Sequence, residues 1–349
     1  MATKLWTLHF MRICLANLLL FMSLYLLYPV LPVMMASRLG VPVSQTGVIF
    51  ILFTLAMFFI GPFHAYLVDV YKRKYICMLS FGVMVAATAG YTLVQNATHL
   101  LMLCIVQGLS FGMAATAGIT LAIDITNSTF RSAGNVVFSW AARLGMIIGA
   151  ALGVYLFRTH GFETLLYVAV ALGALGILFV SRVYVPFRAP IGMKVCSMDR
   201  FLLLRGLIPA FNLILIAFIP GLMLPVLAGA PSDVPVGGET VPFFALVGCG
   251  FLLSVLIVKL FFRYDNKMWL QIVVGLVTVI GSMAMLFSPE TSWNAPAAVL
   301  MGLGLGLVTP EFLMMFVKLS QHCQRGTANT THLLGRCLQA EIYMYAFVW

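Results

Sequence analysis

The chain has 349 residues, of which 62% are hydrophobic and only 9% are charged, and its mean hydropathy is +1.06. These values exclude a water-soluble globular protein. The formal net charge is +10, but the basic residues are scattered over the amino terminus and several loops, without one basic face lined by aromatic residues. We therefore expect no nucleic-acid partner.

Apolar segments of about 20 residues, the length of a helix that crosses a bilayer, follow one another along the chain. They begin near Phe10, Gln45, Tyr75, Thr98, Ala133, Glu163, Phe201, Val241, Met268, Asn294 and Thr327. The sequence thus predicts an all-α, multi-pass membrane protein with about eleven transmembrane helices. We expect residues 1–185 to form an amino-terminal six-helix bundle, residues 186–202 a cytoplasmic linker, and residues 203–349 a carboxy-terminal bundle of five helices, the last one irregular or incomplete.

The second half of the chain repeats landmarks of the first half. The residues Gly108, Leu109, Gly112, Arg131 and Asn135 recur 194 positions later as Gly302, Leu303, Gly306, Arg325 and Asn329. An internal repeat in such an apolar chain is typical of secondary transporters, in which the substrate site lies between two pseudo-symmetric bundles.

The distribution of Lys and Arg predicts the orientation of the chain in the membrane. The predicted loops on one side contain most of the basic residues, among them Lys72, Arg73 and Lys74, whereas only Arg38 and Arg158 fall on the other side. Because cytoplasmic loops carry the excess of Lys and Arg, we expect the amino terminus to be cytoplasmic. The first span is too long for a signal peptide and is expected to be retained.

The turn after the second predicted span resembles the loop signature of the major facilitator superfamily, approximately Gly-x-Leu-Ala-Asp-Arg-x-Gly-Arg-Lys. The segment from Ala65 to Lys74 matches this signature at Leu67, Asp69, Arg73 and Lys74 and departs from it elsewhere, as at Ala65, Val70 and Lys72. The resemblance implies two pseudo-symmetric six-helix bundles, with about 11 of 12 transmembrane helices present here, and transport by alternating access.

In that family the aspartate of the signature lies at the amino-terminal end of the eleventh helix, where exposed N–H groups stabilise a carboxylate. The arginine of the signature reaches an acid at the end of the fourth helix. The resemblance therefore implies a latch that closes the inner faces of the two halves; alternatively, the basic residues of this turn only anchor the chain at the membrane surface. The expected gating residues are Leu67, Asp69, Arg73, Lys74, Asp124, Arg131, Arg325 and Asn329.

Two further family signatures are present in altered form. Cys104 to Gly108 resembles Arg-x-x-Gln-Gly, with Gln107 retained as a candidate residue of the translocation pathway and Cys104 in place of an arginine implicated in proton coupling. We expect coupling through that position to be lost.

In the fifth span, Gly145, Gly149 and Gly153 resemble a pattern associated with antiporters, and the chain resembles bacterial efflux-type members of the family. Small residues four apart also let helices approach closely, so simple helix packing is an equal interpretation. We favour antiport over import.

Ionisable residues within predicted spans are candidates for function, because a charge in hydrocarbon is expensive. Arg143 lies near the middle of the fifth span and is expected to contact either an anionic group or, structurally, backbone carbonyls or Asp124. Glu311 in the tenth span is the candidate proton carrier; a salt bridge to Lys318 is the alternative.

Asn17 and Asn212 occupy near-equivalent places in the first and seventh spans. They suit either hydrogen bonding to a polar substrate or contacts between helices. Phe21, Tyr25 and Tyr28 form an aromatic stripe on the first span. Such a stripe more often packs against other helices than lines a binding site. Tyr25 is a candidate residue of the translocation pathway.

The end of the repeat is irregular. The chain stops at the counterpart of Tyr155, so the sequence predicts that a twelfth helix is absent and that the chain is truncated from a twelve-helix parent. A genuine eleven-helix variant is the alternative. The glycines of the fifth span, Gly145, Gly149 and Gly153, map onto Gln339, Tyr343 and Phe347.

The most specific hypothesis is proton-coupled efflux of a small molecule from the cytoplasm by a monomer in a bacterial inner membrane. The alternatives are an uptake symporter of the same fold and a polytopic sensor or scaffold that moves no solute. The dispersed cysteines and histidines indicate neither a metal site nor a catalytic group, so we expect no cofactor, no metal and no enzymatic activity.

Overall fold

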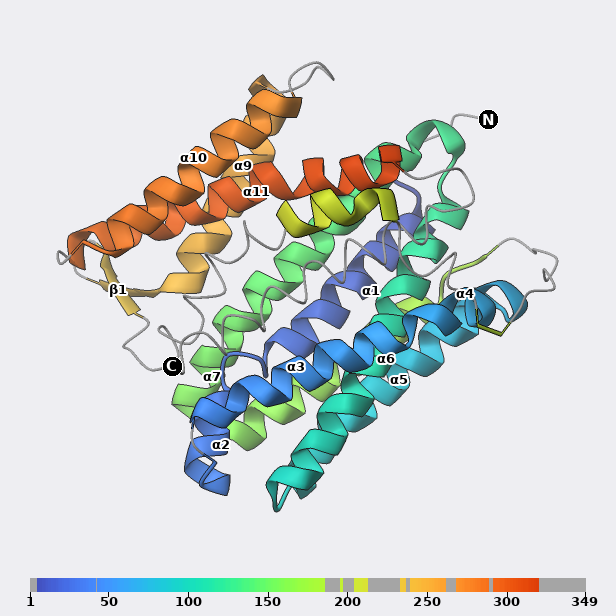
Figure 1. The fold of residues 1–349 in the computed structure, drawn as a ribbon, viewed down its shortest axis with the longest axis horizontal. Coiled ribbons are helices and arrows are strands. Elements are labelled where there is room, and N and C mark those ends of the chain that lie inside the picture. The colour runs from blue at the N-terminus through green and yellow to red at the C-terminus, as the bar shows by residue number, and fades with distance from the viewer. Residues whose placement is uncertain are drawn as a thin grey trace.

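The structure is a computed structural model that describes residues 5–41, 43–185, 195–196, 204–212, 233–236, 239–261, 268–288 and 291–319. Over these ranges the chain is almost entirely helical, and long helices lie side by side across the molecule (Figure 1). Six of the described helices are long and apolar enough to cross a membrane. The spans that begin near Phe201 and Thr327 fall largely or wholly outside the described residues.

The described residues of the first half form the α-helices α1 to α7, the last of which is interrupted at Gly161. In chain order they are α1 (Leu8–Tyr25), α2 (Leu31–Leu39), α3 (Val43–Phe59), α4 (Gly61–Val70), α5 (Arg73–Gly90), α6 (Ala97–Ile125) and α7 (Arg131–Ser181). Two starts are capped by side chains: Thr7 Oγ1 accepts from the N–H of Phe10 at 3.2 Å, and Asn96 Oδ1 accepts from the N–H of His99 at 2.9 Å.

Proline and glycine residues determine where the helices of the first half end and begin. The first span is divided into α1 and α2, and the second into α3 and α4, and in both cases a proline, Pro32 or Pro62, stands at the start of the new helix. Proline lacks an N–H and clashes with the preceding helical turn. The fifth and sixth predicted spans are two helices that share the label α7: the backbone leaves helical geometry at Gly161, where φ is +83° and ψ is 178°, so the chain turns between them.

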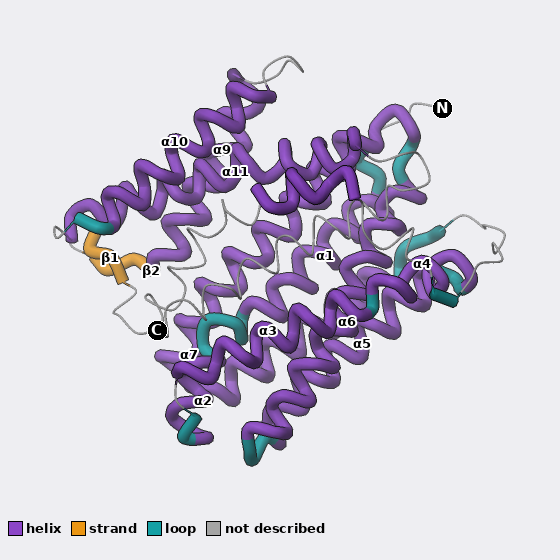
Figure 2. The backbone as a smooth tube through the Cα atoms, viewed as in Figure 1, coloured by secondary structure: helices purple, strands orange, loops and turns teal. Residues whose placement is uncertain are grey.

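The described part of the second half contains three long helices and a hairpin. They are β1 (Asp233–Val236), β2 (Glu239–Pro242), α9 (Phe243–Phe261), α10 (Met268–Leu286) and α11 (Asn294–Leu319). The two strands pair antiparallel, with Val234 opposite Val241, and lie beside the start of α9 (Figure 2). The sequence analysis missed this hairpin, although a Gly-Gly pair between two Val-containing segments is a known hairpin signal.

The helices pack in equivalent groups in the two halves. In the first half α6 packs on α3 and α5, and in the second half α11 packs on α9 and α10. The first half also has a large continuous core of buried side chains from α1, α3, α5, α6 and α7, and α1 makes its most extensive contact with α7. Together these contacts give a rigid amino-terminal helix group against which a polar cluster is held.

Candidate functional site

A polar cluster forms where α4, α5 and α6 meet at one end of the helix group. Asp69 is the next-to-last residue of α4, Arg73 is the first residue of α5, and Asp124 is the next-to-last residue of α6. Between α4 and α5 the backbone is extended at Tyr71 and Lys72, which ends one helix and starts the next. This short turn places two residues four apart in sequence next to one another.

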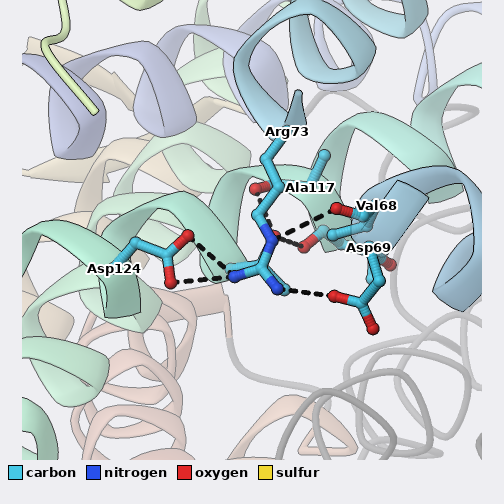
Figure 3. Close-up of polar contacts among 7 residues, drawn as sticks. Val68, Asp69, Arg73, Ala117 and Asp124 are labelled. Carbon is cyan, nitrogen blue, oxygen red and sulfur yellow. Dashed lines mark hydrogen bonds and ion pairs between the residues drawn. The ribbon is translucent and has the colours of Figure 1, made fainter. Parts of the chain in front are cut away.

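The guanidinium of Arg73 lies between the two carboxylates (Figure 3). Its Nη1 donates to both oxygens of Asp124, at 2.8 Å to Oδ1 and 2.7 Å to Oδ2, and its Nη2 donates to Asp69 Oδ1 at 2.6 Å. Its Nε donates to the carbonyl of Val68 at 3.2 Å. One side chain therefore links the ends of three helices.

These three side chains are mostly buried, with exposed fractions of 15% for Arg73, 16% for Asp69 and 11% for Asp124. The planar fork of an arginine suits such an arrangement, because its donors are fixed in direction and its charge persists at all physiological pH values. Within the cluster, these three side chains by themselves carry a formal charge of −1. A second positive group or dipole that approached it would be attracted, which suits a contact that forms and breaks.

The other expected gating residues are placed less completely. Leu67 is partly buried and packs against the core of the first half, and Lys74 is the second residue of α5. Arg131 begins α7, but its side chain lies outside the described part, as do the whole residues Arg325 and Asn329. The expected contact between Asp69 and the eleventh helix thus remains a prediction.

Two pathway candidates take part in contacts between helices. Asn17 is buried on α1, and its amide Nδ2 donates to the carbonyl of Phe138 on α7 at 3.0 Å. Gln107 is buried on α6; its Oε1 accepts from the hydroxyl of Tyr91 at 2.9 Å, and its Nε2 donates to Thr88 Oγ1 at 3.0 Å. Both amides therefore fix neighbouring helices to one another.

Cys104, which stands where the resembled family has an arginine, lies in the same network. Its Sγ is 3.2 Å from the hydroxyl of Tyr91. A neutral thiol fits this position because the surroundings are almost entirely closed to solvent, with Cys104 2% and Tyr91 3% exposed. An arginine here would need a counter-charge.

Tyr25 is half-buried and belongs to an aromatic cluster that extends well beyond α1. Its ring stacks on those of Phe21 and Tyr28, with centroids 6.4 Å and 5.1 Å away. The cluster continues to α3 and α6, because Tyr28 contacts Phe53 at 5.7 Å and Phe21 contacts Phe111 at 5.1 Å. Sequence spacing found Phe21, Tyr25 and Tyr28 but could not find their partners on other helices.

The glycines of the fifth span form the contact surface between α7 and α1. A Cβ on Gly149 would lie 2.7 Å from the carbonyl oxygen of Met22. Cβ atoms on Gly145 and Gly153 would overlap the carbonyl oxygens of Leu18 and Leu26. This stripe therefore permits close approach of the two backbones, as small residues four apart do in membranes.

The three remaining candidates lie on different elements. Arg143 is partly buried on α7, and Glu311 is partly buried on α11, directly after Pro310. The side chain of Lys318, the alternative partner of Glu311, lies outside the described part. Asn212 is exposed at the end of the described stretch 204–212, so it differs in environment from the buried Asn17.

Sequence reasoning missed two polar residues on α7, Ser139 and Trp140. Ser139 is 7% exposed, and its Oγ and the Nε1 of Trp140 are buried with no hydrogen-bond partner among the described residues. Their position about one helical turn before Arg143 is the signal that could have identified them. Within the described ranges, no three His, Cys, Asp or Glu side chains gather as a metal site would require.

Comparison with known proteins gives a consistent result. The sequence model of the Major Facilitator Superfamily matches residues 13–339, whereas no curated relative matches the chain by sequence. Among solved structures, the chain is similar to the human organic anion transporter MFSD10 (TETRAN), with a TM-score of 0.70, 17% identity, and coverage of 97% of this chain and 92% of that one.

Two further solved structures are similar over the same share of this chain. A bacterial homologue of the human lysosomal transporter Spinster, in an inward-facing and unoccupied conformation, has a TM-score of 0.65 and 14% identity over 97% of this chain and 80% of that one. The nucleoside transporter NupG has a TM-score of 0.63 and 14% identity over 97% and 90%. At these identities the likeness concerns the fold.

Proposed function

The chain belongs to the Major Facilitator Superfamily, a family of membrane transporters, and we propose that it exports a small solute in exchange for protons by alternating access. The solute would bind between the two halves, which rock about that site and open it to each side of the membrane in turn. In this proposal residues 1–185 form one half of the transporter, residues 203–349 form the other, and residues 186–202 link them.

The observation that carries this proposal is the bridge from Arg73 to Asp69 and Asp124. It holds the ends of α4, α5 and α6 as one unit and places two carboxylates against one guanidinium. A helix amino terminus from the other half, with its exposed N–H groups and positive dipole, is attracted to such a cluster. The bridge thus supports a latch that is closed while the site faces outward and released when it faces inward.

Proton coupling requires a group inside the membrane that can change its charge. Cys104 occupies the position of the arginine implicated in coupling, and Glu311 on α11 is an acid within a described span. We assign Glu311 the role of proton carrier and Arg143 that of a contact for an anionic group. Proton binding at Glu311 and solute binding would then favour opposite orientations of the halves.

The transporters that share the fold carry different solutes, an organic anion in one case and a nucleoside in another. Their shared fold therefore supports the transport of a small organic solute. The chemical class of that solute has to be inferred from the residues of this chain. For the membrane, the excess of Lys and Arg in one set of loops supports a cytoplasmic amino terminus in a bacterial inner membrane, where the protein would act as a monomer.

The test uses the purified protein in liposomes. Solutes that accumulate from a cell extract under an imposed pH gradient would be identified by mass spectrometry, and the identified solute would then be used in labelled form for counterflow. Accumulation that requires the pH gradient, with counterflow that does not, supports proton-coupled transport. If accumulation did not depend on the pH gradient, proton coupling would be overturned, whereas the transport function would stand.

A sensor or scaffold is the second candidate, and the network around Cys104 is what favours it. The thiol of Cys104 and the amide of Gln107 both contact the hydroxyl of Tyr91. Two positions of a family signature therefore take part in contacts within the protein. A sensor would bind a solute, detectable as a rise in thermal stability, and show neither accumulation nor counterflow. An uptake symporter would show accumulation driven by a pH gradient of the opposite direction.

A further inference from the structure

The first span of α7, residues 131–160, has three distinct faces. Gly145, Gly149 and Gly153 lie against the backbone of α1. Ile147 faces elsewhere: it packs against a buried cluster formed by β1, α9 and α11, and a Cβ on Gly248 of α9 would lie 3.1 Å from its Cγ2. The face that contains Ile147 is therefore turned toward the second half of the chain.

Polar side chains share this face with Ile147. Since an α-helix turns about 100° per residue, Trp140 lies roughly 20° from Ile147 around the axis, and Arg143 lies about 40° from it on the other side. Ser139 follows at the edge of the same face, about 80° from Ile147. The glycines that meet α1 lie roughly 120° to 160° away. This region is thus a polar strip between the halves.

Two hydrogen-bonding atoms of this strip are buried without a protein partner in the described part of the chain. They are Ser139 Oγ, on a residue that is 7% exposed, and the Nε1 of Trp140. Leaving a buried donor unsatisfied costs about 1–3 kcal/mol, so such atoms call for a ligand or water. Two of them on adjacent residues at the boundary between the halves indicate a place where a solute binds.

The chemistry of the strip selects an anion. An indole N–H donates only, a hydroxyl donates as readily as it accepts, and the guanidinium of Arg143 adds a positive charge one turn further on. The sequence of residues 131–160 contains no Asp or Glu, so this span offers no carboxylate to a cationic solute. A carboxylate meets all three groups with its acceptor oxygens and its charge.

We propose that Ser139 and Trp140, next to Arg143, form the binding site for the carboxylate of a small organic anion. The inference rests on the proposed function, since it names the substrate class of the site between the halves. Trp140 and Ser139 contact the bound carboxylate directly, and the guanidinium of Arg143 balances its charge. Release into water follows when the halves rock and the strip becomes hydrated.

The experiment uses the full chain in detergent micelles and three probes of the same size: benzoate, benzamide and benzamidinium. Binding is measured as the rise in unfolding temperature with probe concentration, which gives an apparent dissociation constant. Benzoate should stabilise the protein, whereas neutral benzamide and cationic benzamidinium should bind at least about tenfold more weakly.

The variants Trp140→Phe and Ser139→Ala should each weaken benzoate binding about tenfold, because each removes one donor to a charged acceptor. Trp269→Phe is the matched control; Trp269 is 68% exposed on α10, and its replacement should leave benzoate binding unchanged. Equal binding of the three probes, or unchanged benzoate affinity in Trp140→Phe and Ser139→Ala, would overturn the assignment.

Flux measurements separate this inference from the proposed function. If the protein accumulates a cationic or neutral solute in liposomes while benzoate fails to bind, the transport function stands and the anion site is wrong. If benzoate binds through Trp140 and Ser139 but no solute exchanges across the membrane, the site stands and the transport function is wrong.

Discussion

Gly108 on α6 lies against the backbone carbonyl of Phe53 on α3, so closely that a Cβ at position 108 would overlap the carbonyl oxygen. The same relationship recurs 194 residues later, where a Cβ on Gly302 of α11 would overlap the carbonyl oxygen of Val247 on α9. Gly302 follows Gly108 by 194 residues, and Val247 follows Phe53 by the same number. The sequence repeat is therefore also a repeat of helix contacts.

The next turn of each helix shows the same correspondence. A Cβ on Gly112 would lie 2.5 Å from Met57 Cγ and 3.3 Å from Ile60 Cγ2. A Cβ on Gly306 would meet Phe251 and Ser254, the residues 194 positions after Met57 and Ile60. Ile60 contributes a methyl group to this contact, and Ser254 contributes its smaller side chain at the corresponding position.

Replacing Gly302 by alanine should destabilise the protein. Alanine is intrinsically better in a helix than glycine by about 1 kcal/mol, but here its methyl group would press on a backbone carbonyl that cannot move aside as a side chain does. Overpacking of this kind costs about 1–3 kcal/mol. The measurement is the unfolding temperature of purified Gly302→Ala in detergent, followed by tryptophan fluorescence.

The matched control is Gly281→Ala on α10, where a Cβ would have no other atom within 4 Å. This variant should unfold at the same temperature as the unaltered protein or slightly above it. If Gly302→Ala and Gly281→Ala behaved alike, the close contact between α9 and α11 would be disproved.

The bridge at Arg73 should be sensitive to the loss of Asp124. Asp124→Asn removes the negative charge and one of the two acceptor oxygens that face the guanidinium of Arg73, a side chain that is only 15% exposed. Breaking a buried ion pair costs about 3–5 kcal/mol, and the remaining contact of Arg73 with Asp69 should reduce this to about 2–3 kcal/mol. Chemical denaturation of the variant in micelles would measure the loss.

Glu163→Gln provides the comparison for that measurement. Glu163 pairs with Arg38 at 3.9 Å, but the two side chains are 68% and 51% exposed, and such surface pairs contribute less than about 1 kcal/mol. We therefore expect a clear loss in the free energy of unfolding for Asp124→Asn and almost no loss for Glu163→Gln. The reverse order would show that the cluster at Arg73 is not a structural bridge.

The network of Tyr91 and Gln107 should behave as one coupled unit. Tyr91→Phe leaves the buried Oε1 of Gln107 without its donor, and Gln107→Leu removes the acceptor of Tyr91; each should cost about 1–3 kcal/mol. The double variant should be more stable than the sum of the two losses by about 1 kcal/mol, because both partners are then absent. Additive losses in a double-mutant cycle would argue against the hydrogen bond.

The membrane class, the helical fold and the family could be predicted from the sequence, because each depends on patterns that span many residues. Apolar segments of bilayer length, the repeat of 194 residues and the matches at Asp69 and Arg73 each limit the fold independently. The prolines Pro32 and Pro62 were visible as well, but their effect depends on whether neighbouring helices satisfy the freed backbone groups, which one sequence does not reveal.

Side-chain partners were harder to predict, since they depend on how helices face one another. Asn17 could equally bind a solute or a neighbouring helix, and only the packing of α1 on α7 brings it within 3.0 Å of the carbonyl of Phe138. Ser139 and Trp140 looked ordinary in the sequence, because an unsatisfied hydroxyl or indole is defined by its surroundings. The direction of α7 relative to the second half is what makes these two residues candidates.

The last prediction concerns Asp69, the member of the cluster that would face the other half of the protein. Asp69→Ala leaves the contact of Arg73 with both oxygens of Asp124 in place, so the protein should still fold and insert into the membrane, with a smaller loss of stability than Asp124→Asn. Transport should fall about tenfold, because the latch then lacks the carboxylate that favours the outward-facing state. Counterflow of the solute identified in liposomes measures the rate, and the yield of folded protein measures insertion.

Lys72→Ala separates the latch from the simpler interpretation that this turn only anchors the chain. Lys72 is exposed and its Nζ lies 5.8 Å from the centre of the Tyr75 ring, at a position that suits the membrane surface. If anchoring were the whole role of the turn, Lys72→Ala would lower the yield of inserted protein and Asp69→Ala would transport normally. The latch requires the opposite result: insertion preserved in both variants, and transport lost when the carboxylate of Asp69 is removed, since a carboxylate contributes nothing to attraction by an anionic membrane surface.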